Sequence, residues 1–456
     1  MELQGIKTLV VGLGRTGEAV CKFLSERGAQ VKISEKSPPE SLGNKIDFWR
    51  KNGVVVEAGG HRLQSFLDAD LIIPSPGVPY IPELDEARKK GIEIISEIEM
   101  AYRFLKGKIV GITGTNGKST TATLSHKILQ DGGLRSHLAG NIGTPLIHFV
   151  EKSQPDDIYV TELSSFQLRY INKFRAAVAV FLNITADHLD WHTDFEDYYQ
   201  SKKNLLLTQK EEDTAILNRD YPQVWALRKL GKFHVYAFSQ TGKVTHGCWI
   251  QDNRIILANE IQENLMQISE SSLFGVHNRE NIMASALVGH VFKIPAVAIK
   301  KSISGFSGLE HRLEKVLKIG QVEFYNDSKA TNIDASLKSI QSFSGPITLI
   351  LGGRDKGGDF VQLREPVRTK VKSIVLIGEA TDKIRKSLDG TVPMKKASDL
   401  KEAVHLAYSA AFPMGVVLLA PGCTSFDMFK SFEERGKVFK KEVRALKERV
   451  EQGNVQ

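Results

Sequence analysis

The chain has 456 residues, too many for one hydrophobic core, and this length predicts two or three domains. Hydrophobic residues make up 41% of it and charged residues 25%, a balance typical of soluble globular proteins. The amino terminus has no signal-peptide pattern, and no apolar run approaches the length that spans a bilayer. The three cysteines have no metal-binding or redox spacing, which favours a reducing cytoplasm over an oxidising compartment. We therefore expect a cytoplasmic protein, and the lack of a long apolar run predicts that it does not enter the membrane.

The formal net charge is +8. This excess fits either a basic surface without a specific role or the attraction of polyanionic small molecules. Lysine and arginine are scattered, and they are not interleaved with aromatic residues as in surfaces that stack bases. Nucleic acid is therefore not an expected partner.

Short apolar segments alternate with helical segments in three successive blocks, which predicts three α/β domains with parallel sheets. The first block, residues 1–95, opens with an expected strand, a glycine-rich turn and a helix that ends near residue 27. It predicts a Rossmann-like domain. Its strands are expected at residues 6–11, 31–33, 54–57, 71–73 and 92–95.

The second block, residues 96–303, predicts a central P-loop-type ATPase domain with a parallel sheet. A small β excursion is expected at residues 232–272. The third block, residues 304–456, again predicts a Rossmann-like domain, and its last helix, 432–450, alternates in charge and is expected to be a solvated face. The strands of these blocks are expected at residues 108–110, 158–161, 178–184, 322–325, 347–351, 373–377 and 416–419, with a helix at 278–290.

Residues 111–120, Gly-Ile-Thr-Gly-Thr-Asn-Gly-Lys-Ser-Thr, join an expected strand to a helix that starts at Lys118. Such a turn directs backbone N–H groups and the positive end of the helix dipole at a phosphate, and the lysine adds a full charge. Ser119 or Thr120 can place a hydroxyl on Mg²⁺. The common P-loop spacing requires glycine where this chain has Ile112, so the segment predicts nucleotide triphosphate binding by a variant loop.

Gly12, Gly14 and Gly17 form a G-x-G-x-x-G pattern after the first expected strand, with Glu35 eighteen residues beyond Gly17. This is the dinucleotide fingerprint, but alone it is a weak signal, because a tight strand-to-helix turn also needs glycine for packing. The pattern favours diphosphate binding at the helix start and leaves NAD and other nucleotides open.

Two residues of the second block, Glu162 and His188, are candidates for metal chemistry. Glu162 ends a strand expected beside the phosphate loop, where it would hold Mg²⁺ or, as the alternative, cap the next turn. His188, flanked by acids at another strand end, is a metal ligand, a donor to phosphate or a structural residue. Lys202 belongs, by its pattern alone, to an ordinary helix face.

The loops of the third block are dense in polar residues. Residues 326–332 combine an acid, a base and hydroxyls, and the upstream Arg312 could place a guanidinium on a phosphate. Residues 352–358 and 421–425 form two more loops at strand ends. Because ligands bind at the carboxyl ends of strands in such sheets, this block predicts part of an active site.

At this point the segments resemble a known family. Residues 113–119 resemble the ATP loop of the Mur ligases and of their relative folylpolyglutamate synthase, which share the unusual spacing. Residues 140–143, 163–168 and 326–332 are similar to segments of the Mur ligases that add D-glutamate. The resemblance covers essentially the whole chain, with the three blocks in order.

The resemblance implies a three-domain ligase with ATP, two Mg²⁺ ions and a carbamate on Lys202 as cofactors. ATP would phosphorylate the carboxylate of UDP-N-acetylmuramoyl-L-alanine, and the amine of D-glutamate would then displace the phosphate to form an amide. The partners would be these small molecules alone, and we expect a monomer.

The resemblance also implies roles for individual residues. The catalytic residues would be Lys118, Glu162, His188 and Lys202, and the Mg²⁺ ligands Ser119, Glu162, His188 and the modified Lys202. ATP would meet Gly114, Thr115, Asn116, Gly117, Lys118, Ser119, Thr120, Asn278, Asn281, Arg312 and Asp327. The uridine diphosphate would meet Arg15, Thr16, Ser75, Pro76 and Gly77, the muramoyl-alanine part Asn141 and Ser164, and D-glutamate Lys329, Thr331, Lys356, Ser425 and Phe432.

One position departs from the family. Its members often carry Asp-Thr or Asp-Ser after the second strand to meet the uracil, whereas this chain has Glu35-Lys36. Three other functions remain as alternatives: a sister ligase that adds another amino acid or adds glutamate to folate, an NAD-dependent dehydrogenase, and a nucleotide-driven switch or assembly module.

Overall fold

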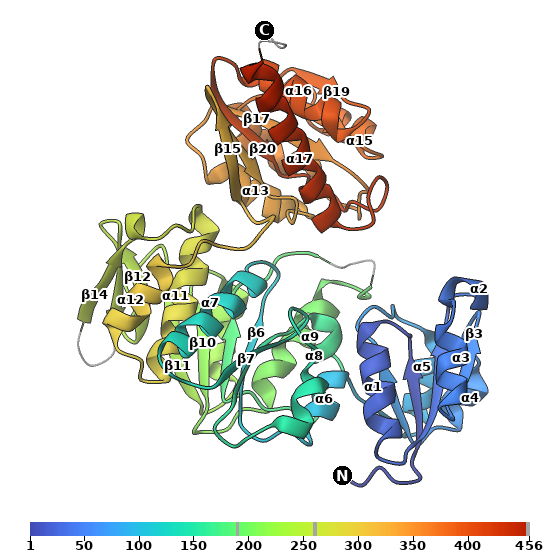
Figure 1. Cartoon of the computed structure of the whole chain (residues 1–456). Coiled ribbons are helices and arrows are strands. Elements are labelled where there is room, and N and C mark those ends of the chain that lie inside the picture. The colour runs from blue at the N-terminus through green and yellow to red at the C-terminus, as the bar shows by residue number, and fades with distance from the viewer. Residues whose placement is uncertain (188–190, 259–261, 453–456) are drawn as a thin grey trace. The chain divides into compact units, whose positions relative to one another are not determined.

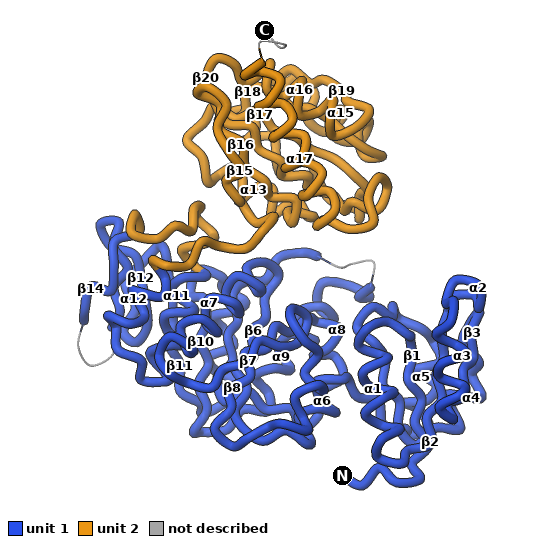
Figure 2. The backbone as a smooth tube through the Cα atoms, in the orientation of Figure 1, with its two compact units in different colours: residues 1–267, 281–303 blue, residues 268–280, 304–456 orange. Residues whose placement is uncertain are grey.

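The computed structural model describes residues 1–187, 191–258 and 262–452. In this part of the chain the strands form three sheets, each with helices packed on it, which confirms the predicted α/β class (Figure 1). The chain divides into two compact units, residues 1–267 with 281–303 and residues 268–280 with 304–456 (Figure 2). No helix within the described residues is long and apolar enough to cross a membrane.

The first sheet has the strand order β3-β2-β1-β4-β5, and all of its neighbouring strands are parallel. Its residues form the Rossmann-like arrangement that the sequence predicts. The strands are β1 (Lys7–Val11), β2 (Gln30–Glu35), β3 (Val55–Ala58), β4 (Leu71–Pro74) and β5 (Glu93–Ile94). The helices are α1 (Arg15–Ser25), α2 (Pro39–Leu42), α3 (Lys45–Lys51), α4 (Leu63–Leu67) and α5 (Pro82–Lys89).

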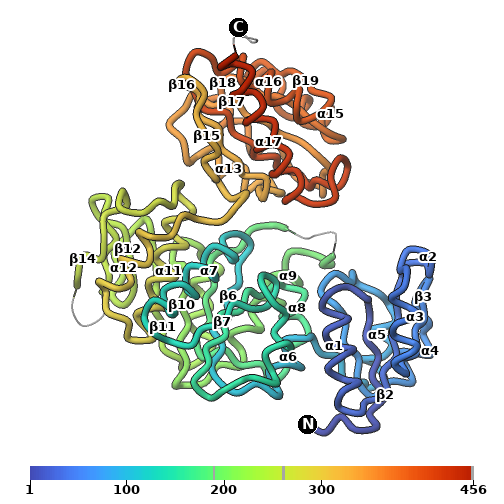
Figure 3. Tube along the Cα trace, viewed as in Figure 1, coloured from blue at the N-terminus to red at the C-terminus, as the bar shows by residue number. Residues whose placement is uncertain are grey.

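The central sheet has the order β14-β13-β12-β11-β10-β9-β6-β8-β7. It is parallel from β7 to β12 and antiparallel from β12 to β14, so the β excursion expected near residues 232–272 extends the edge of this sheet (Figure 3). The strands are β6 (Lys108–Thr113), β7 (Ser136–Gly140), β8 (Ile158–Glu162), β9 (Val178–Phe181), β10 (Thr214–Asn218), β11 (His234–Ser239), β12 (Gly247–Gln251), β13 (Arg254–Ala258) and β14 (Gln262–Gln267).

The helices that accompany the central sheet include the one that follows the phosphate loop, α7, which starts at Lys118 as predicted. They are α6 (Glu97–Tyr102), α7 (Lys118–Asp131), η1 (Leu146–Lys152), α8 (Ser165–Leu168), α9 (Phe195–Leu207), α10 (Pro222–Ala226), η2 (Leu227–Lys229), α11 (Val276–Val291) and α12 (Ala296–Ser304).

The third sheet has the order β15-β16-β20-β17-β18-β19, with only the β15–β16 pair antiparallel among its described neighbours. The strands are β15 (Glu314–Ile319), β16 (Gln321–Asn326), β17 (Ile347–Gly352), β18 (Val371–Ile377), β19 (Met394–Lys396) and β20 (Met414–Leu419). The helices are η3 (Ile268–Glu270), α13 (Ile333–Gln341), η4 (Phe360–Leu363), α14 (Arg364–Lys370), α15 (Thr381–Ser387), α16 (Leu400–Ala411) and α17 (Phe432–Glu451).

The expectation that the last helix is merely a solvated face is wrong. One side of α17 buries Phe439, Val443 and Leu446 in the core of the third sheet, and the same helix also buries Arg435. The exposed side carries Glu433, Lys437, Lys441, Arg444 and Glu448, whereas Arg435 and Lys440 are buried. Apolar residues at positions 439, 443 and 446 have helical spacing, which is the signal that the charge pattern obscured.

Helix α6 connects the first sheet to the central one through two buried glutamates. Glu97 accepts a hydrogen bond of 2.7 Å from the backbone N–H of Ile147. Glu99 accepts hydrogen bonds from the backbone N–H groups of residues 172–174 and pairs with Arg103. These carboxylates therefore hold the connecting segment against the central domain.

Burial raises the pKa of the Glu97 carboxyl from 4.5 to about 7, and the hydrogen bonds from Ile147 and Leu146 oppose this rise. The folded state thus binds a proton more tightly than the unfolded state, so this group's contribution to stability is lost as the pH rises from about 4.5 to 7.

In Glu97→Gln we expect the fall of the urea midpoint between pH 5 and pH 8 to become shallower. The exposed Glu40→Gln is the control, and equal slopes in wild type and Glu97→Gln would contradict the assignment.

Candidate active site

The phosphate loop lies between β6 and α7. Gly114 and Gly117 have positive φ angles of 150° and 87°, which other residues rarely adopt. The Lys118 Nζ donates hydrogen bonds to the carbonyl oxygens of Gly114 and Thr115 at 2.9 and 2.7 Å, so the lysine curls over its own loop. The Asn183 Oδ1 accepts from the N–H groups of Thr115 and Asn116, which fixes the loop against β9.

Glu162 ends β8 beside this loop, as the sequence predicts. Its side chain is buried, and its two oxygens have different partners. The Ser119 hydroxyl donates to Oε2 at 2.6 Å, and the Asn141 amide donates to Oε1 at 2.9 Å. A carboxylate and a hydroxyl from facing segments therefore lie in contact, and both are ligands that Mg²⁺ prefers.

Lys202 points from α9 to the same loop. It is only 1% exposed, and its Nζ donates to the Gly114 carbonyl oxygen at 2.9 Å. Burial lowers the pKa of this amine well below its ordinary value, and the positive charge of Lys118 lowers it further. The pattern-based interpretation of Lys202 as an ordinary helix-face residue is therefore wrong, because this side chain enters the interior.

His188 lies outside the described residues. Within the described ranges, no cluster of three histidine, cysteine, aspartate or glutamate side chains could hold a metal ion by itself. Asn281 of α11 contributes to the loop differently: its Oδ1 accepts from the Thr121 hydroxyl at 3.1 Å. A Cβ added at Gly117 would lie 2.3 Å from that same oxygen.

A cavity of about 470 Å³ lies over the carboxyl ends of the first sheet. It collects the residues predicted to bind uridine diphosphate, together with Asn141 from the central domain. Gly12 and Gly17 are needed here for close packing, because a Cβ at Gly17 would lie 2.1 Å from the Gly12 carbonyl oxygen. The lining comprises Gly12, Leu13, Gly14, Arg15, Thr16, Glu35, Lys36, Ser37, His61, Ser75, Pro76, Gly77, Val78, Pro79, Ile81, Gly140, Asn141 and Gln167.

The Glu35 carboxylate serves the protein backbone. Its oxygens accept hydrogen bonds from the N–H groups of Leu13 and Ser37 at 2.7 and 2.8 Å. Although burial raises the pKa of this carboxyl, these hydrogen bonds outweigh that effect and lower it. Glu35 therefore shapes the loop that follows β1, and it does not present a free carboxylate as the ribose ligand of a dinucleotide site would.

Ser164 caps the short helix α8 beside the cavity. The Ser164 hydroxyl accepts from the N–H of Gln167, and the Gln167 side chain accepts from the N–H of Ser164, which is a capping box. Gln167 also lines the cavity. The segment around Ser164 thus joins the end of β8, which carries Glu162, to the cavity wall.

In the second compact unit, several predicted residues lie at the carboxyl end of β16. The Lys329 Nζ lies 3.9 Å from the centre of the Phe432 ring. Asp327 is buried and accepts a hydrogen bond from the Ser339 hydroxyl, and burial raises the pKa of its carboxyl to about 6. The positive charge of the nearby Arg312 opposes this rise in the pKa of Asp327.

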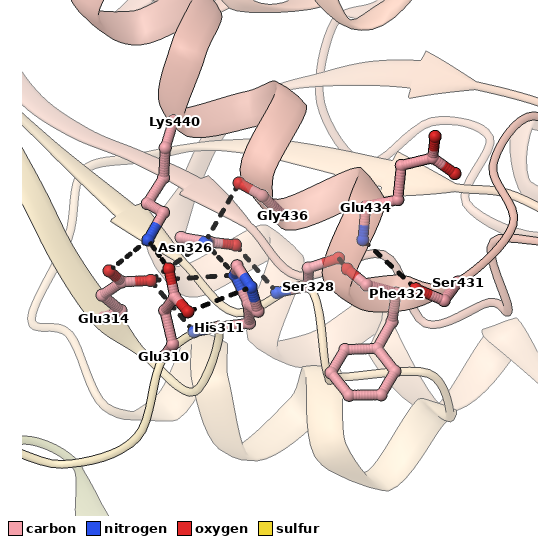
Figure 4. A network of polar contacts seen from close by, with 10 residues as sticks. All are labelled: Glu310, His311, Glu314, Asn326, Ser328, Ser431, Phe432, Glu434, Gly436 and Lys440. Atoms are coloured by element: carbon pink, nitrogen blue, oxygen red, sulfur yellow. Dashed lines mark hydrogen bonds and ion pairs between the residues drawn. The ribbon is translucent and has the colours of Figure 1, made fainter.

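The buried Arg435 of α17 ties two strand-end loops together. Its guanidinium donates to Ser328 through both the hydroxyl and the carbonyl oxygen, and to the carbonyl oxygens of Cys423 and Thr424. Figure 4 shows the neighbouring polar network, in which Asn326 and His311 lie beside Gly436 of α17. These contacts fix Ser328 and Thr424, which adjoin Lys329 and Ser425 in the sequence, and the first turn of α17, which carries Phe432.

Other predicted residues are less closely connected. Lys356 is exposed in the loop after β17, whereas Thr331 is half-buried, with its N–H bonded to the Lys329 carbonyl oxygen at 2.8 Å. The Asn278 amide donates to the Phe274 carbonyl oxygen at 2.6 Å. Asn278 and Asn281 share α11 but belong to different compact units.

Three family descriptions match this chain in sequence order. They are the Mur ligase MurD-like N-terminal domain over residues 6–96, the Mur ligase middle domain over 112–289 and the Mur ligase glutamate ligase domain over 311–423. A UDP-N-acetylmuramoylalanine–D-glutamate ligase of Acidobacterium capsulatum is 45% identical over 444 residues, which cover 96% of each chain. The chain belongs to the Mur ligase family.

A second curated relative agrees with this assignment, and solved structures share the fold. A ligase of the same description from Koribacter versatilis is 42% identical over 98% of this chain and 99% of its own. Among solved structures, a UDP-N-acetylmuramate-alanine ligase from Thermotoga maritima has a TM-score of 0.57 at 15% identity, covering 97% of this chain and all of its own. A pseudomurein peptide ligase from Methanothermus fervidus has a TM-score of 0.62 at 19% identity, over 96% and 100%. At such identities these structures support the fold alone.

Sequence reasoning missed several residues at and near this candidate site. Ser37 and His61 line the cavity, and each follows a strand of the first sheet, so strand-end position was an available signal. Arg435 had no such signal, because its position within a charged helix resembles that of any surface residue.

Gly117 provides a direct test of the loop. In Gly117→Ala, the new Cβ would meet the Asn281 amide oxygen and the backbone would keep a left-handed angle that costs alanine roughly 1–2 kcal/mol. We expect the affinity for an ATP analogue, measured by calorimetry, to fall by about tenfold or more. Gly242→Ala, where a Cβ meets nothing within 4 Å, is the control and should bind as wild type does. Unchanged affinity in Gly117→Ala would contradict this role of the loop.

Proposed function

We propose that this chain is an ATP-dependent ligase that joins D-glutamate to UDP-N-acetylmuramoylalanine in peptidoglycan precursor synthesis. The observation that carries the proposal is that Glu162 and Asn141 connect the phosphate loop to a cavity lined by Arg15 and Ser75. Relatives named UDP-N-acetylmuramoylalanine–D-glutamate ligases share 40–45% identity with the chain over nearly its full length.

ATP binds at the loop of residues 114–120. Backbone N–H groups and the start of α7 face the phosphates, and Lys118 moves from its loop carbonyls to the β- and γ-phosphates. Asn278 and Asn281 of α11, with Arg312 and Asp327 of the third domain, complete the nucleotide contacts.

The chemistry proceeds in two balanced steps. A carboxylate oxygen of the alanyl group attacks the γ-phosphorus, and the bond to ADP breaks, which leaves an acyl phosphate. The amine of D-glutamate then attacks the acyl carbon, loses a proton and expels phosphate, which retains the carboxylate oxygen. Both steps bring anions together, so the cationic loop with Lys118 is required.

The donor atoms around the loop fit Mg²⁺. The Ser119 hydroxyl and the Glu162 carboxylate are hard oxygen ligands in mutual contact, and His188 and a carbamate on Lys202 complete the proposed set. When bound, two Mg²⁺ ions neutralise the charge that gathers between phosphate and carboxylate. Burial supports the carbamate, because it keeps the Lys202 amine neutral and therefore nucleophilic toward CO₂.

The remaining residues bind the two other substrates. Arg15, Thr16, Ser75, Pro76 and Gly77 hold the uridine diphosphate, and Asn141 and Ser164 hold the muramoyl-alanine part. Lys329, Thr331, Lys356, Ser425 and Phe432 form the D-glutamate pocket. Two lysines suit a substrate with two carboxylates.

Three further points belong to this proposal. The chain has functional domains at residues 1–95, 96–303 and 304–456. It acts as a monomer in the cytoplasm. Its partners are the small-molecule substrates, without nucleic acid or membrane.

Phosphate release tests the activity. With ATP, Mg²⁺ and UDP-N-acetylmuramoyl-L-alanine, we expect release to depend on D-glutamate and to be close to background with L-glutamate. Release that is indifferent to D-glutamate would contradict the proposal. Preference for another amino acid, or for a folate acceptor, would indicate a sister ligase, and saturable binding of NADH would favour the dehydrogenase alternative.

Lys202 tests the carbamate. In Lys202→Ala we expect activity to fall by about a hundredfold or more and to recover in part with added formate or acetate, which supply the missing carboxylate. The ¹³C NMR spectrum of wild type in ¹³C-bicarbonate should show a carbamate signal that Lys202→Ala lacks. Lys203→Ala is the matched control. Full activity of Lys202→Ala, or an unchanged carbamate signal, would refute the assignment.

A further inference from the structure

Trp191 belongs to the central part of the chain but packs on the first domain. Its indole N–H donates a hydrogen bond of 2.7 Å to the carbonyl oxygen of Val78. Its ring packs against a cluster of buried apolar side chains in the first domain that includes Ile81 and Leu84. The side chain therefore holds the loop that carries Ser75, Pro76 and Gly77.

Trp191 also contacts residues of α8 and its end, as well as the ring of the adjacent His192. Its ring centre is 4.4 Å from that of Phe166, and the Arg169 guanidinium lies 5.6 Å from the indole ring. One indole thus touches two segments that face the same cavity, since Val78 lines one wall and Gln167 of α8 lines another.

His192 anchors the segment that carries Trp191. It is 3% exposed, and its Nε2 and Nδ1 lie 2.9 and 2.8 Å from the Ser165 hydroxyl and the Asp197 carboxylate. Its ring stacks on Phe166 at 5.7 Å. The arrangement has the residues of a hydrolase triad, but Ser165 is only 1% exposed and cannot receive a substrate, so the contacts are structural.

We propose that Trp191 is a positioning residue for the nucleotide-sugar substrate. It fixes the Val78 loop relative to α8, and His192 holds it in place through Ser165 and Asp197. This role rests on the proposed function, since it concerns the cavity to which that function assigns the uridine diphosphate.

The test uses the full-length enzyme and the variant Trp191→Phe, which keeps an aromatic ring and removes the indole N–H. We expect the Kd for UDP-N-acetylmuramoyl-L-alanine, measured by calorimetry without ATP, to rise about five- to tenfold, the effect of one lost hydrogen bond. The KM for this substrate should rise by a similar factor, while kcat and the KM values for ATP and D-glutamate should stay within about twofold of the wild-type values. A general loss of folded enzyme would lower kcat and would not raise this one KM.

Trp225→Phe is the matched control, because Trp225 packs on the core near Arg228, away from the cavity lining. It should bind and react as wild type does. His192→Phe keeps ring stacking and removes both hydrogen bonds, and it should raise the same Kd. The Kd of the double variant should exceed that of His192→Phe by no more than about twofold, because the two residues act as one unit.

The outcomes separate the two claims. If wild type binds the nucleotide sugar and Trp191→Phe binds it equally well, the role of Trp191 is overturned and the proposed function stands. Fully additive losses in the double variant would overturn the anchoring role of His192. If wild type does not bind the nucleotide sugar, the proposed function fails and this role fails with it.

Discussion

The Glu162 carboxylate lies between the Ser119 hydroxyl and the Asn141 amide, and this interaction links the parts of the site. Ser119 is in the first turn of α7, beside the phosphate loop, and Asn141 is in the wall of the first-domain cavity. A buried carboxylate is costly unless its oxygens have partners. The pairing therefore fixes the first turn of α7 relative to the cavity wall at Asn141, the two places to which the proposed function assigns the triphosphate and the substrate.

The two lysines near this carboxylate show how burial assigns different roles to one residue type. Lys118 lies at the start of α7, and its Nζ donates hydrogen bonds to loop carbonyl oxygens. Phosphate oxygens could take the place of these acceptors. Lys202 is fully enclosed, and both its burial and the charge of Lys118 favour its neutral form. Two adjacent cations would repel each other, so conversion of one amine to an anion would relieve that repulsion and add a metal ligand.

Local features were predictable from the sequence, whereas contacts between distant segments were not. The phosphate loop and the strand-end position of Glu162 depend on a few consecutive residues, and both appear where the spacing predicted them. Lys202 meets Gly114 across 88 positions, and Trp191 meets Val78 across 113. Helical periodicity says which face of a helix is apolar, but it does not say that a lysine on that helix will enter the core.

The central claim is that ATP activates the substrate carboxylate as an acyl phosphate. The most direct measurement starts from UDP-N-acetylmuramoyl-L-alanine labelled with ¹⁸O in the alanyl carboxylate and follows the label by mass spectrometry after turnover with ATP and D-glutamate. The account predicts that the released phosphate carries one ¹⁸O atom from the carboxylate. Phosphate without the label, formed together with the amide product, would contradict it.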